Sequence, residues 1–344
     1  MNFATPQYSK NQVNRAGRIL VSLGDTSSSD MEWARQVLSN WRAIHAYPLN
    51  TFQATLRRKL REGDYSREYI VAQRLKRSPS IITKLRRFPD MQLARMQDIG
   101  GLRAIVQDAR ELSMLHEDYM STHFLHVLKR KNDYVAQPKD DGYRSIHLVY
   151  RYQNKRQPIY NGLHIELQLR TKVQHAWATA VETIGTFLNQ ALKSGEGEEK
   201  WREFFLLASG YFSCIERTPK PRILADLSCN EIRKAALSEF KRLDFEHILT
   251  GFSIATDMIS QIHSGYYHLI ILDLYEHSVQ VKSYSKDDYD NAINDYSSYE
   301  LEALLGRKIE VVLTLGANVN SLRAAYPNYF LDTKAFIDLL QSDS

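Results

Sequence analysis

The sequence has very little cysteine and no long apolar run. Its two cysteines, Cys214 and Cys229, do not form a Cys-x-x-Cys pair, which argues against a disulfide scaffold or a cysteine-built zinc site and fits a reducing cytoplasm. The amino-terminal residues lack a basic stretch followed by an apolar run, so no secretory signal is expected. The longest apolar runs, such as residues 269–272, are too short to cross a bilayer. We therefore expect a cytoplasmic protein that does not contact a membrane.

Acidic residues are scarce in the first two thirds of the chain and abundant in the last third. The 344 residues carry a net charge of +5. Residues 226–344 contain 10 Lys and Arg against 18 Asp and Glu, a net of −8, which leaves +13 on residues 1–225. The basic part suits phosphates or nucleic acid, and the acidic part could cover that surface, although compositional drift between two domains would give the same division.

Hydrophobic spacing predicts helices and strands mixed along the chain, as in an α/β or α+β protein. Helices are expected over 31–41, 50–63, 79–88, 173–191, 201–216 and 230–243. Strands are expected over 102–106, 145–152, 163–169 and 308–315, with a hairpin of 266–275 and 278–284. The clearest domain boundary is at 218–221, because two prolines within three residues stop a helix.

The segment 162–171 alternates between apolar and polar residues without interruption. Its apolar residues are Leu163, Ile165, Leu167 and Leu169, and its polar residues are His164, Glu166, Gln168 and Arg170. This pattern predicts a half-buried strand. The polar face is consistent with a plain amphipathic edge strand, or with the floor of a metal–phosphate site in which Glu166 is a metal ligand or general base.

Three other segments contain residues that suit phosphate chemistry. In 74–84, the cations Arg74, Lys76 and Arg77 precede an expected helix that carries Lys84, which suits a polyphosphate or simply a solvated basic face. In 98–106, an acid and two glycines precede a strand, as at a Mg²⁺ site or a capped turn. In 138–147, a glycine-containing loop with basic residues and Tyr143 suits phosphate and base stacking, or is an ordinary turn.

The order of these four segments resembles the synthetase domain of the RelA/SpoT family. The motifs are R-x-K…S-x-x-x-K, D-I-G-G-L-R, P-K-x-x-G-Y-R-S-x-H and E-L-Q-L-R-T, over about residues 60–190. The resemblance implies an α+β fold with a mixed β-sheet flanked by helices. It also implies transfer of a pyrophosphoryl group from ATP to a ribose 3′-hydroxyl, usually of GDP or GTP. The chain has no His-Asp dipeptide, so the family's hydrolase domain is not expected.

The resemblance implies a role for each residue that matches a motif. Asp98 and Glu166 would be catalytic and would bind Mg²⁺, the cofactor. The ATP-binding residues would be Arg74, Lys76, Lys84 and Arg103, with Arg103 stacking on adenine. The acceptor-binding residues would be Lys139, Tyr143, Arg144, His147, Gln168 and Arg170, with Tyr143 stacking on the acceptor base.

The acidic part of the chain matches no enzyme motif and holds nine tyrosines. Tyr326 and Tyr329 flank a proline turn and would either enter a nucleotide pocket or anchor a small sheet. The domain order resembles toxic small alarmone synthetases of the CapRel type, which are fused to their own antitoxin. The resemblance implies a pyrophosphotransferase (toxin) domain at 1–220 and a smaller β-rich, pseudo-zinc-finger-like autoinhibitory sensor (antitoxin) domain at 221–344.

This resemblance implies a specific biological role. A phage protein, such as the major capsid protein, would release the inhibition, and the enzyme would pyrophosphorylate the 3′ CCA end of tRNA and block translation. One alternative is synthesis of guanosine or adenosine alarmones from nucleotide acceptors. An alternative of another class is a catalytically inactive module that senses a partner, although Asp98 and Glu166 are both present.

Overall fold

The chain divides into two compact units. The computed structural model describes residues 3–22, 27–76, 78–121, 124–187, 198–261, 265–273, 275–276, 278–315 and 329–342. Unit 1 comprises Met1–Tyr134 and Ser145–Lys172, and unit 2 comprises Val135–Arg144 and Val173–Ser344.

Unit 1 is built on a mixed five-stranded sheet, which confirms the predicted fold class. Its strands are β1 (Ile70–Leu75), β2 (Gly100–Val106), β3 (Val127–Asp133), β4 (Ile146–Arg151) and β5 (His164–Thr171), in the order β1-β2-β5-β4-β3. β2 and β5 are parallel, and the other neighbouring pairs are antiparallel. The register places β2 and β5 side by side at the centre of the sheet, where the predicted site residues lie.

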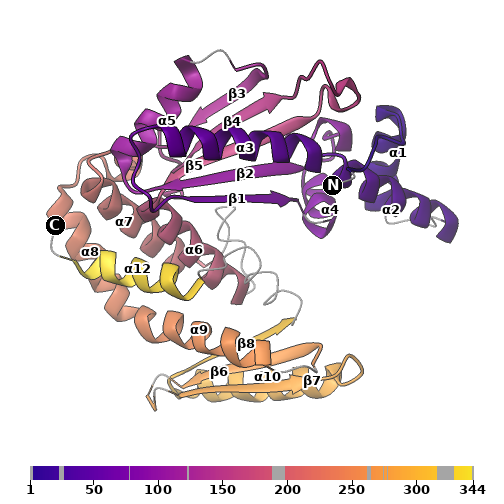
Figure 1. Cartoon of the computed structure of the whole chain (residues 1–344). Helices are drawn as coiled ribbons and strands as arrows, with labels where there is room; N and C mark the ends of the chain where they lie inside the picture. Colours follow the sequence, from indigo (N-terminus) through magenta and orange to yellow (C-terminus); the bar gives the residue numbers. More distant parts are fainter. Residues whose placement is uncertain are drawn as a thin grey trace. The chain divides into compact units, whose positions relative to one another are not determined.

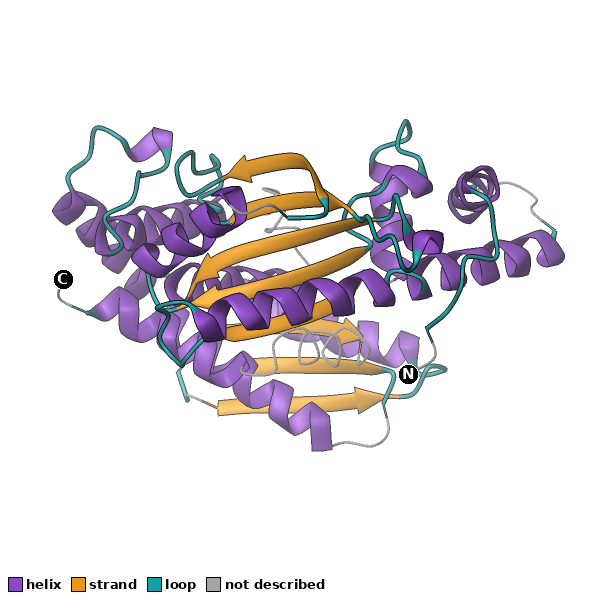
Figure 2. Ribbon diagram, turned by 45° about the horizontal axis from the view of Figure 1, so that its top comes forward, coloured by secondary structure: helices purple, strands orange, loops and turns teal. Residues whose placement is uncertain are grey.

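Helices surround this sheet. They are α1 (Lys10–Val21), α2 (Ser28–Ala43), α3 (Ala46–Glu62), α4 (Ser78–Arg87) and α5 (Ala109–Ser121), with 3-10 turns η1 (Leu93–Arg95) and η2 (Pro158–Tyr160). α3 crosses one face of the sheet (Figures 1 and 2), and its Phe52 packs on Tyr150 of β4 with ring centroids 5.7 Å apart. Tyr119 of α5 packs on the same tyrosine at 6.2 Å. α3 and α5 therefore cover the apolar face.

Close packing beneath α3 explains a glycine at the start of β2. A Cβ atom added at Gly100 would lie 2.8 Å from Cδ1 of Ile165 and 3.3 Å from Cγ of Leu49. Contacts under 3.0 Å force a neighbour to move, and the interior of a protein has little free volume for that movement. Gly100 therefore lets β2, β5 and α3 approach one another directly behind Asp98.

Unit 2 combines helices with a three-stranded antiparallel sheet. Its helices are α6 (Lys172–Phe187), α7 (Glu199–Ile215), α8 (Cys229–Arg242), α9 (Phe245–Gln261), α10 (Tyr289–Leu304) and α12 (Tyr329–Gln341), with the 3-10 turn η4 (Arg222–Leu224). Its strands are β6 (Tyr267–Asp273), β7 (Ser278–Tyr284) and β8 (Ile309–Leu315), in the order β7-β6-β8. The predicted hairpin is confirmed as β6–β7.

The division between the units differs from the predicted boundary at 218–221. One hydrophobic core joins Trp177 and Phe204 of α6 and α7 to Phe245 of α9, Ile270 of β6 and Phe336 of α12. A helix groups with the surface that buries its apolar face, and α6 and α7 bury theirs in this core. The proposed functional division into 1–220 and 221–344 stays a prediction.

The two cysteines form a disulfide bond, which differs from the expectation for a chain with so little cysteine. Cys214 near the end of α7 and Cys229 at the start of α8 are bonded, with Cα atoms 5.9 Å apart. The separation of 15 residues gave no sign of this proximity, because it depends on how α7 and α8 pack. A single bond beside an extensive hydrophobic core is not a disulfide scaffold.

Candidate functional site

The polar face of β5 carries a hydrogen-bonded acid, as the alternation predicted. Ile165, Leu167 and Leu169 are fully buried on one face, and Glu166 and Gln168 are partly buried on the other. Nδ1 of His147 lies 3.0 Å from Oε1 of Glu166, and Nε2 of Gln168 donates to Oε2 at 2.8 Å. Both carboxylate oxygens of Glu166 are therefore engaged, and the group is held in one orientation.

A second acid lies at the start of β2 between two lysines. Nζ of Lys76, directly after β1, and Nζ of Lys84, on α4, each donate to Oδ2 of Asp98 at 2.9 Å. Oδ1 of Asp98 is buried and has no hydrogen-bond partner among the residues that the structure describes. The structure thus brings together three predicted site residues and leaves one buried carboxylate oxygen without a hydrogen-bond partner among the described residues.

The surroundings keep both acids ionised. Burial alone would raise the pKa of Asp98, but the charges and hydrogen bonds of Lys76 and Lys84 outweigh it and lower the pKa below its ordinary value. Burial also opposes ionisation of Glu166, yet the hydrogen bond and charge of His147 lower its pKa. The negative charge of Asp98 raises the pKa of Glu166. The two acids are therefore close enough to interact and belong to one cluster.

The arginines predicted to bind ATP lie on the same face of the sheet as Glu166. Arg74 pairs with Gly101, Gly101 pairs with Glu166, and Arg103 pairs with Gln168. Paired residues share a face and alternate along each strand. This face therefore carries more cations than acids, which suits a polyphosphate.

The donor set fits Mg²⁺ where phosphate oxygens complete the coordination. Proteins usually hold Mg²⁺ through one or two carboxylates together with substrate phosphates. Within the described ranges, no group of three or more His, Cys, Asp and Glu side chains could hold a metal ion. The unpartnered Oδ1 of Asp98 suits a metal ligand, whereas the hydrogen-bonded oxygens of Glu166 suit a base. The metal-binding role of Glu166 stays a prediction.

The first three predicted acceptor-binding residues belong to unit 2. The ring of Tyr143 meets that of Trp177 edge-on at 6.3 Å, and Nζ of Lys139 lies 5.0 Å from the centroid of Tyr143. Nη1 of Arg144 donates to Oε2 of Glu216 at 2.7 Å, and only 2% of the side chain is exposed. Arg144 thus forms an internal ion pair and has almost no surface for a ligand, so its acceptor-binding role gains no support.

The other three predicted acceptor-binding residues lie on the sheet of unit 1. His147 pairs with Gln168 across β4 and β5, beside Glu166. Arg170 is buried, and its Nε donates to Oγ of Ser145 at 3.4 Å. His147 and Gln168 therefore remain candidates for contact with an acceptor, whereas Arg170 packs inside the unit.

The side chains of the two tyrosines with a predicted autoinhibitory role lie outside the described part of the chain. Tyr326 lies outside the described residues, and Tyr329 begins α12 without a described side chain. Their autoinhibitory role stays a prediction.

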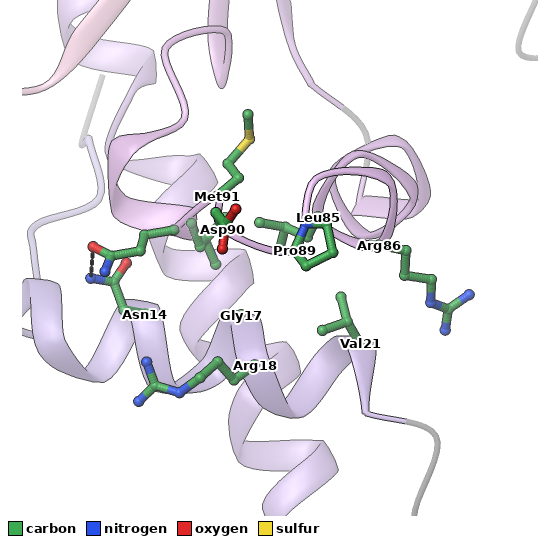
Figure 3. A pocket seen from close by; sticks show the side chains of 11 residues that line it. Asn14, Gly17, Arg18, Val21, Leu85, Arg86, Pro89, Asp90 and Met91 are labelled. Carbon is green, nitrogen blue, oxygen red and sulfur yellow. Dashed lines mark hydrogen bonds between the residues drawn. The ribbon is translucent and has the colours of Figure 1, made fainter.

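A separate cavity of about 610 Å³ lies between α1, α4 and the loop that follows α4 (Figure 3). Its lining residues are Asn14, Gly17, Arg18, Val21, Leu85, Arg86, Pro89, Asp90, Met91, Gln92 and Leu93. None of the predicted site residues lines it, although Lys84 directly precedes Leu85 on α4. The predicted site residues therefore lie outside this cavity.

One residue beside the acid cluster carried no signal in the sequence. Nε of Arg42, on α2, donates to the carbonyl oxygen of Lys76 at 2.7 Å across 34 residues of chain. Arg42 belongs to none of the four motifs, and a side chain that binds a distant backbone carbonyl leaves no local pattern. Only the fold reveals this contact.

Comparison with known proteins places a family region over this cluster. Residues 73–185 match the family model described as "Region found in RelA / SpoT proteins". Residues 73–185 thus resemble a RelA/SpoT region. The region covers the second half of β1, then α4 and β2 through β5, and it contains all the predicted ATP-, acceptor- and metal-binding residues.

The relatives that resemble the RelA/SpoT region include named pyrophosphokinases. GTP pyrophosphokinase YjbM of Bacillus subtilis is 34% identical over 125 residues, which cover 36% of this chain and 59% of that protein. GTP pyrophosphokinase of Haemophilus influenzae is 34% identical over 89 residues, 25% of this chain and 10% of that protein. The chain thus spans less than two thirds of the length of these relatives.

Solved structures also align with part of the chain. Small alarmone synthetase 1 of Bacillus subtilis, bound to its product pppGpp, has 25% sequence identity and a TM-score of 0.45, over 53% of this chain and 94% of that one. Across the described residues, every helix is too short or too polar to span a membrane.

Proposed function

We propose that the chain transfers pyrophosphate from ATP to the 3′-hydroxyl of a guanosine nucleotide, GDP or GTP. The RelA/SpoT region supports this proposal, because relatives that match it carry the name GTP pyrophosphokinase. The chain matches only part of those proteins, so the activity and the substrates are inferred from the site.

One observation carries the proposal. Asp98 is held between Lys76 and Lys84 through Oδ2, while its buried Oδ1 has no partner among the described residues. A triphosphate would accept hydrogen bonds from Nζ of Lys76 and Nζ of Lys84 in place of Asp98. Its oxygens, together with Asp98, would hold a metal ion. Phosphoryl-type transfer depends mainly on such positioning and charge neutralisation.

The proposed reaction balances with the groups on this face of the sheet. The acceptor 3′ oxygen attacks the β-phosphorus of ATP, the bond from that phosphorus to the oxygen bridging the α-phosphorus breaks, and AMP leaves. Glu166 receives the hydroxyl proton, since it is ionised and held by His147 and Gln168. A Mg²⁺ ion on Asp98 would neutralise phosphate charge.

The test is a transfer assay with the full chain. The protein is incubated with Mg²⁺, ATP labelled at the γ-phosphate and one acceptor at a time: GDP, GTP, ADP, ATP or tRNA. We expect label on GDP or GTP in the wild type and none in Asp98→Asn. Wild-type protein that labels no acceptor would favour the inactive binding module and refute the proposal.

A second candidate is modification of the 3′ CCA end of tRNA, controlled by the acidic part of the chain. The net charge of +13 on residues 1–225 favours it, because contact with the RNA backbone requires positive surface. Label on tRNA that falls steeply with salt would support this candidate. Release by a phage protein predicts that the major capsid protein raises the labelling, and that Tyr326→Ala raises it without the phage protein.

A further inference from the structure

Arg42 donates hydrogen bonds both to the residue that follows β1 and to the first residue of α4. Its Nε donates to the carbonyl oxygen of Lys76 at 2.7 Å, and its Nη1 donates to Oγ of Ser78 at 3.3 Å. Lys76 directly follows the last residue of β1, and Ser78 is the first residue of α4. Because the guanidinium is planar and rigid, two bonds from one group fix the separation of the two residues.

The backbone of Lys76 is also held from the opposite side. Its N–H donates to the carbonyl oxygen of Ile99 at 2.8 Å, which extends the pairing of β1 with β2. Ile99 directly follows Asp98, and Nζ of Lys76 reaches that acid at 2.9 Å. Arg42 therefore completes a set of contacts that fixes the backbone of Lys76, from which the side chain reaches Asp98.

The junction between α2 and α3 supports the other side of the same cluster. His45 is buried, with its Nδ1 2.7 Å from the carbonyl oxygen of Trp41. A Cβ atom added at Gly100 would lie 3.4 Å from Cβ of His45 and 3.3 Å from Cγ of Leu49. Residues 42–49 thus contact both Gly100 of β2 and, through Arg42, Lys76 and Ser78.

The charge of Arg42 suits an anionic ligand near this turn. Among the described residues, both of its acceptors, a carbonyl and a hydroxyl, are neutral, so neither compensates its charge. A cation near the first turn of a helix opposes the helix dipole, whereas an anion there is favoured by the dipole and by the free N–H groups. A phosphate bound to Lys76 and Lys84 would partly neutralise the positive charges of these lysines and of Arg42.

We propose that Arg42, outside the RelA/SpoT region, is a positioning residue for ATP that holds Lys76 and the start of α4 in their phosphate-binding geometry. The inference rests on the proposed function and assigns part of the ATP site to α2. Arg42 acts through the backbone of Lys76, so its loss reduces ATP affinity more than acceptor affinity.

The test measures binding of α,β-methylene-ATP with Mg²⁺ to the full-length chain by titration calorimetry. We expect Arg42→Met to weaken binding by about tenfold to a hundredfold, the usual effect of losing hydrogen bonds from a charged donor. Arg42→Lys should weaken it less, since an ammonium donates to the carbonyl but cannot bridge both acceptors. Arg35→Met, an exposed arginine on α2, is the matched control and should bind within about twofold of the wild type.

Affinity for GDP and the melting temperature separate positioning from a merely structural role. The inference predicts that Arg42→Met keeps its GDP affinity and melts within a few degrees of the wild type. If Arg42→Met does not fold, Arg42→Lys decides the question. Unchanged affinity for the ATP analogue, or an equal loss for both nucleotides, overturns the inference alone. A wild type that binds no ATP analogue overturns the proposed function as well.

Discussion

Each unit contains a carboxylate held by basic side chains at hydrogen-bond distance, but the two clusters differ in exposure. In unit 1, Asp98 accepts from Lys76 and Lys84 at 2.9 Å, and 20% of the Asp98 side chain and 31% of the Lys84 side chain are exposed. In unit 2, Glu216 accepts from Arg144 at 2.7 Å, and the two side chains are 4% and 2% exposed.

The remaining contacts of each cluster show what it can do. Arg144 also donates to Oγ of Ser209 and of Thr218, and Nε2 of Gln174 donates to Glu216. Asp98 instead keeps a buried oxygen without a partner among the described residues. Partly exposed ion pairs exchange partners at little cost, whereas a buried pair cannot lose one member cheaply. The pair in unit 1 is therefore suited to a ligand, whereas the pair in unit 2 is suited to stabilising the fold.

The largest expected effect is on the stability of unit 2. Arg144→Met leaves the carboxylate of Glu216 buried without its cation, and such a change costs about 3–5 kcal/mol. We expect a large decrease in the free energy of unfolding, measured by urea denaturation. Arg222→Met, an exposed arginine of the same unit, is the control. A loss below about 1 kcal/mol for Arg144→Met would mean that the pair is not structural.

The next effect is on catalysis in unit 1. Asp98→Asn and Glu166→Gln should each lower the single-turnover rate of pyrophosphate transfer by at least ~100-fold, on the order of 3 kcal/mol in the barrier. Their melting temperatures should stay close to that of the wild type. Asp64→Asn, at an exposed acid of the same unit, should keep the full rate. Near-normal turnover in Asp98→Asn or Glu166→Gln would remove that residue from the mechanism.

A smaller effect distinguishes a ligand-binding lysine from a structural one. Lys84→Met should weaken binding of an ATP analogue by about tenfold while changing the free energy of unfolding by less than ~1 kcal/mol, because its ion pair is partly exposed. Calorimetry and urea denaturation of the same preparation give both values. If Lys84→Met greatly lowers the free energy of unfolding and leaves the affinity for the ATP analogue unchanged, Lys84 is a structural residue like Arg144. The two units would then not differ in the way described above.

The smallest effect is the pH dependence of stability. The lysines lower the pKa of Asp98 below its ordinary value of 3.8, so its ionised form stabilises the folded state above that pH. This contribution is lost as pH falls through the lower folded value. The difference in unfolding free energy between wild type and Asp98→Asn should be constant above about pH 5 and shrink below about pH 4. If this difference in unfolding free energy grows as the pH falls, the lysines do not lower the pKa of Asp98.

The sequence indicated which acids and lysines the structure brings together, because strand alternation and motif order are local properties. The face of β5 that carries Glu166 follows from the period of two, and the neighbouring motifs supplied Asp98 and Lys84. β1 was missed because it is an edge strand without a fully buried side chain, so it lacks a hydrophobic pattern. The helix α10 was missed for a similar reason, because its acidic, tyrosine-rich sequence carries a weak apolar stripe.

The roles of individual cations could not be read from their motif. Arg144 and His147 lie three residues apart in one motif, yet Arg144 is buried against Glu216 while His147 contacts Glu166. Burial depends on long-range packing, which motif spacing does not encode. Arg42 was missed for the same reason, since its acceptors lie 34 and 36 residues away.

The central claim is that Asp98 would hold a Mg²⁺ ion that neutralises the phosphate charge of ATP. The direct measurement is titration calorimetry of wild type and Asp98→Asn with α,β-methylene-ATP, each with and without Mg²⁺. The account predicts that Mg²⁺ strengthens binding to the wild type by about tenfold or more, on the order of one charge-assisted contact, and has little effect on Asp98→Asn. An equal effect of Mg²⁺ on both proteins would contradict it.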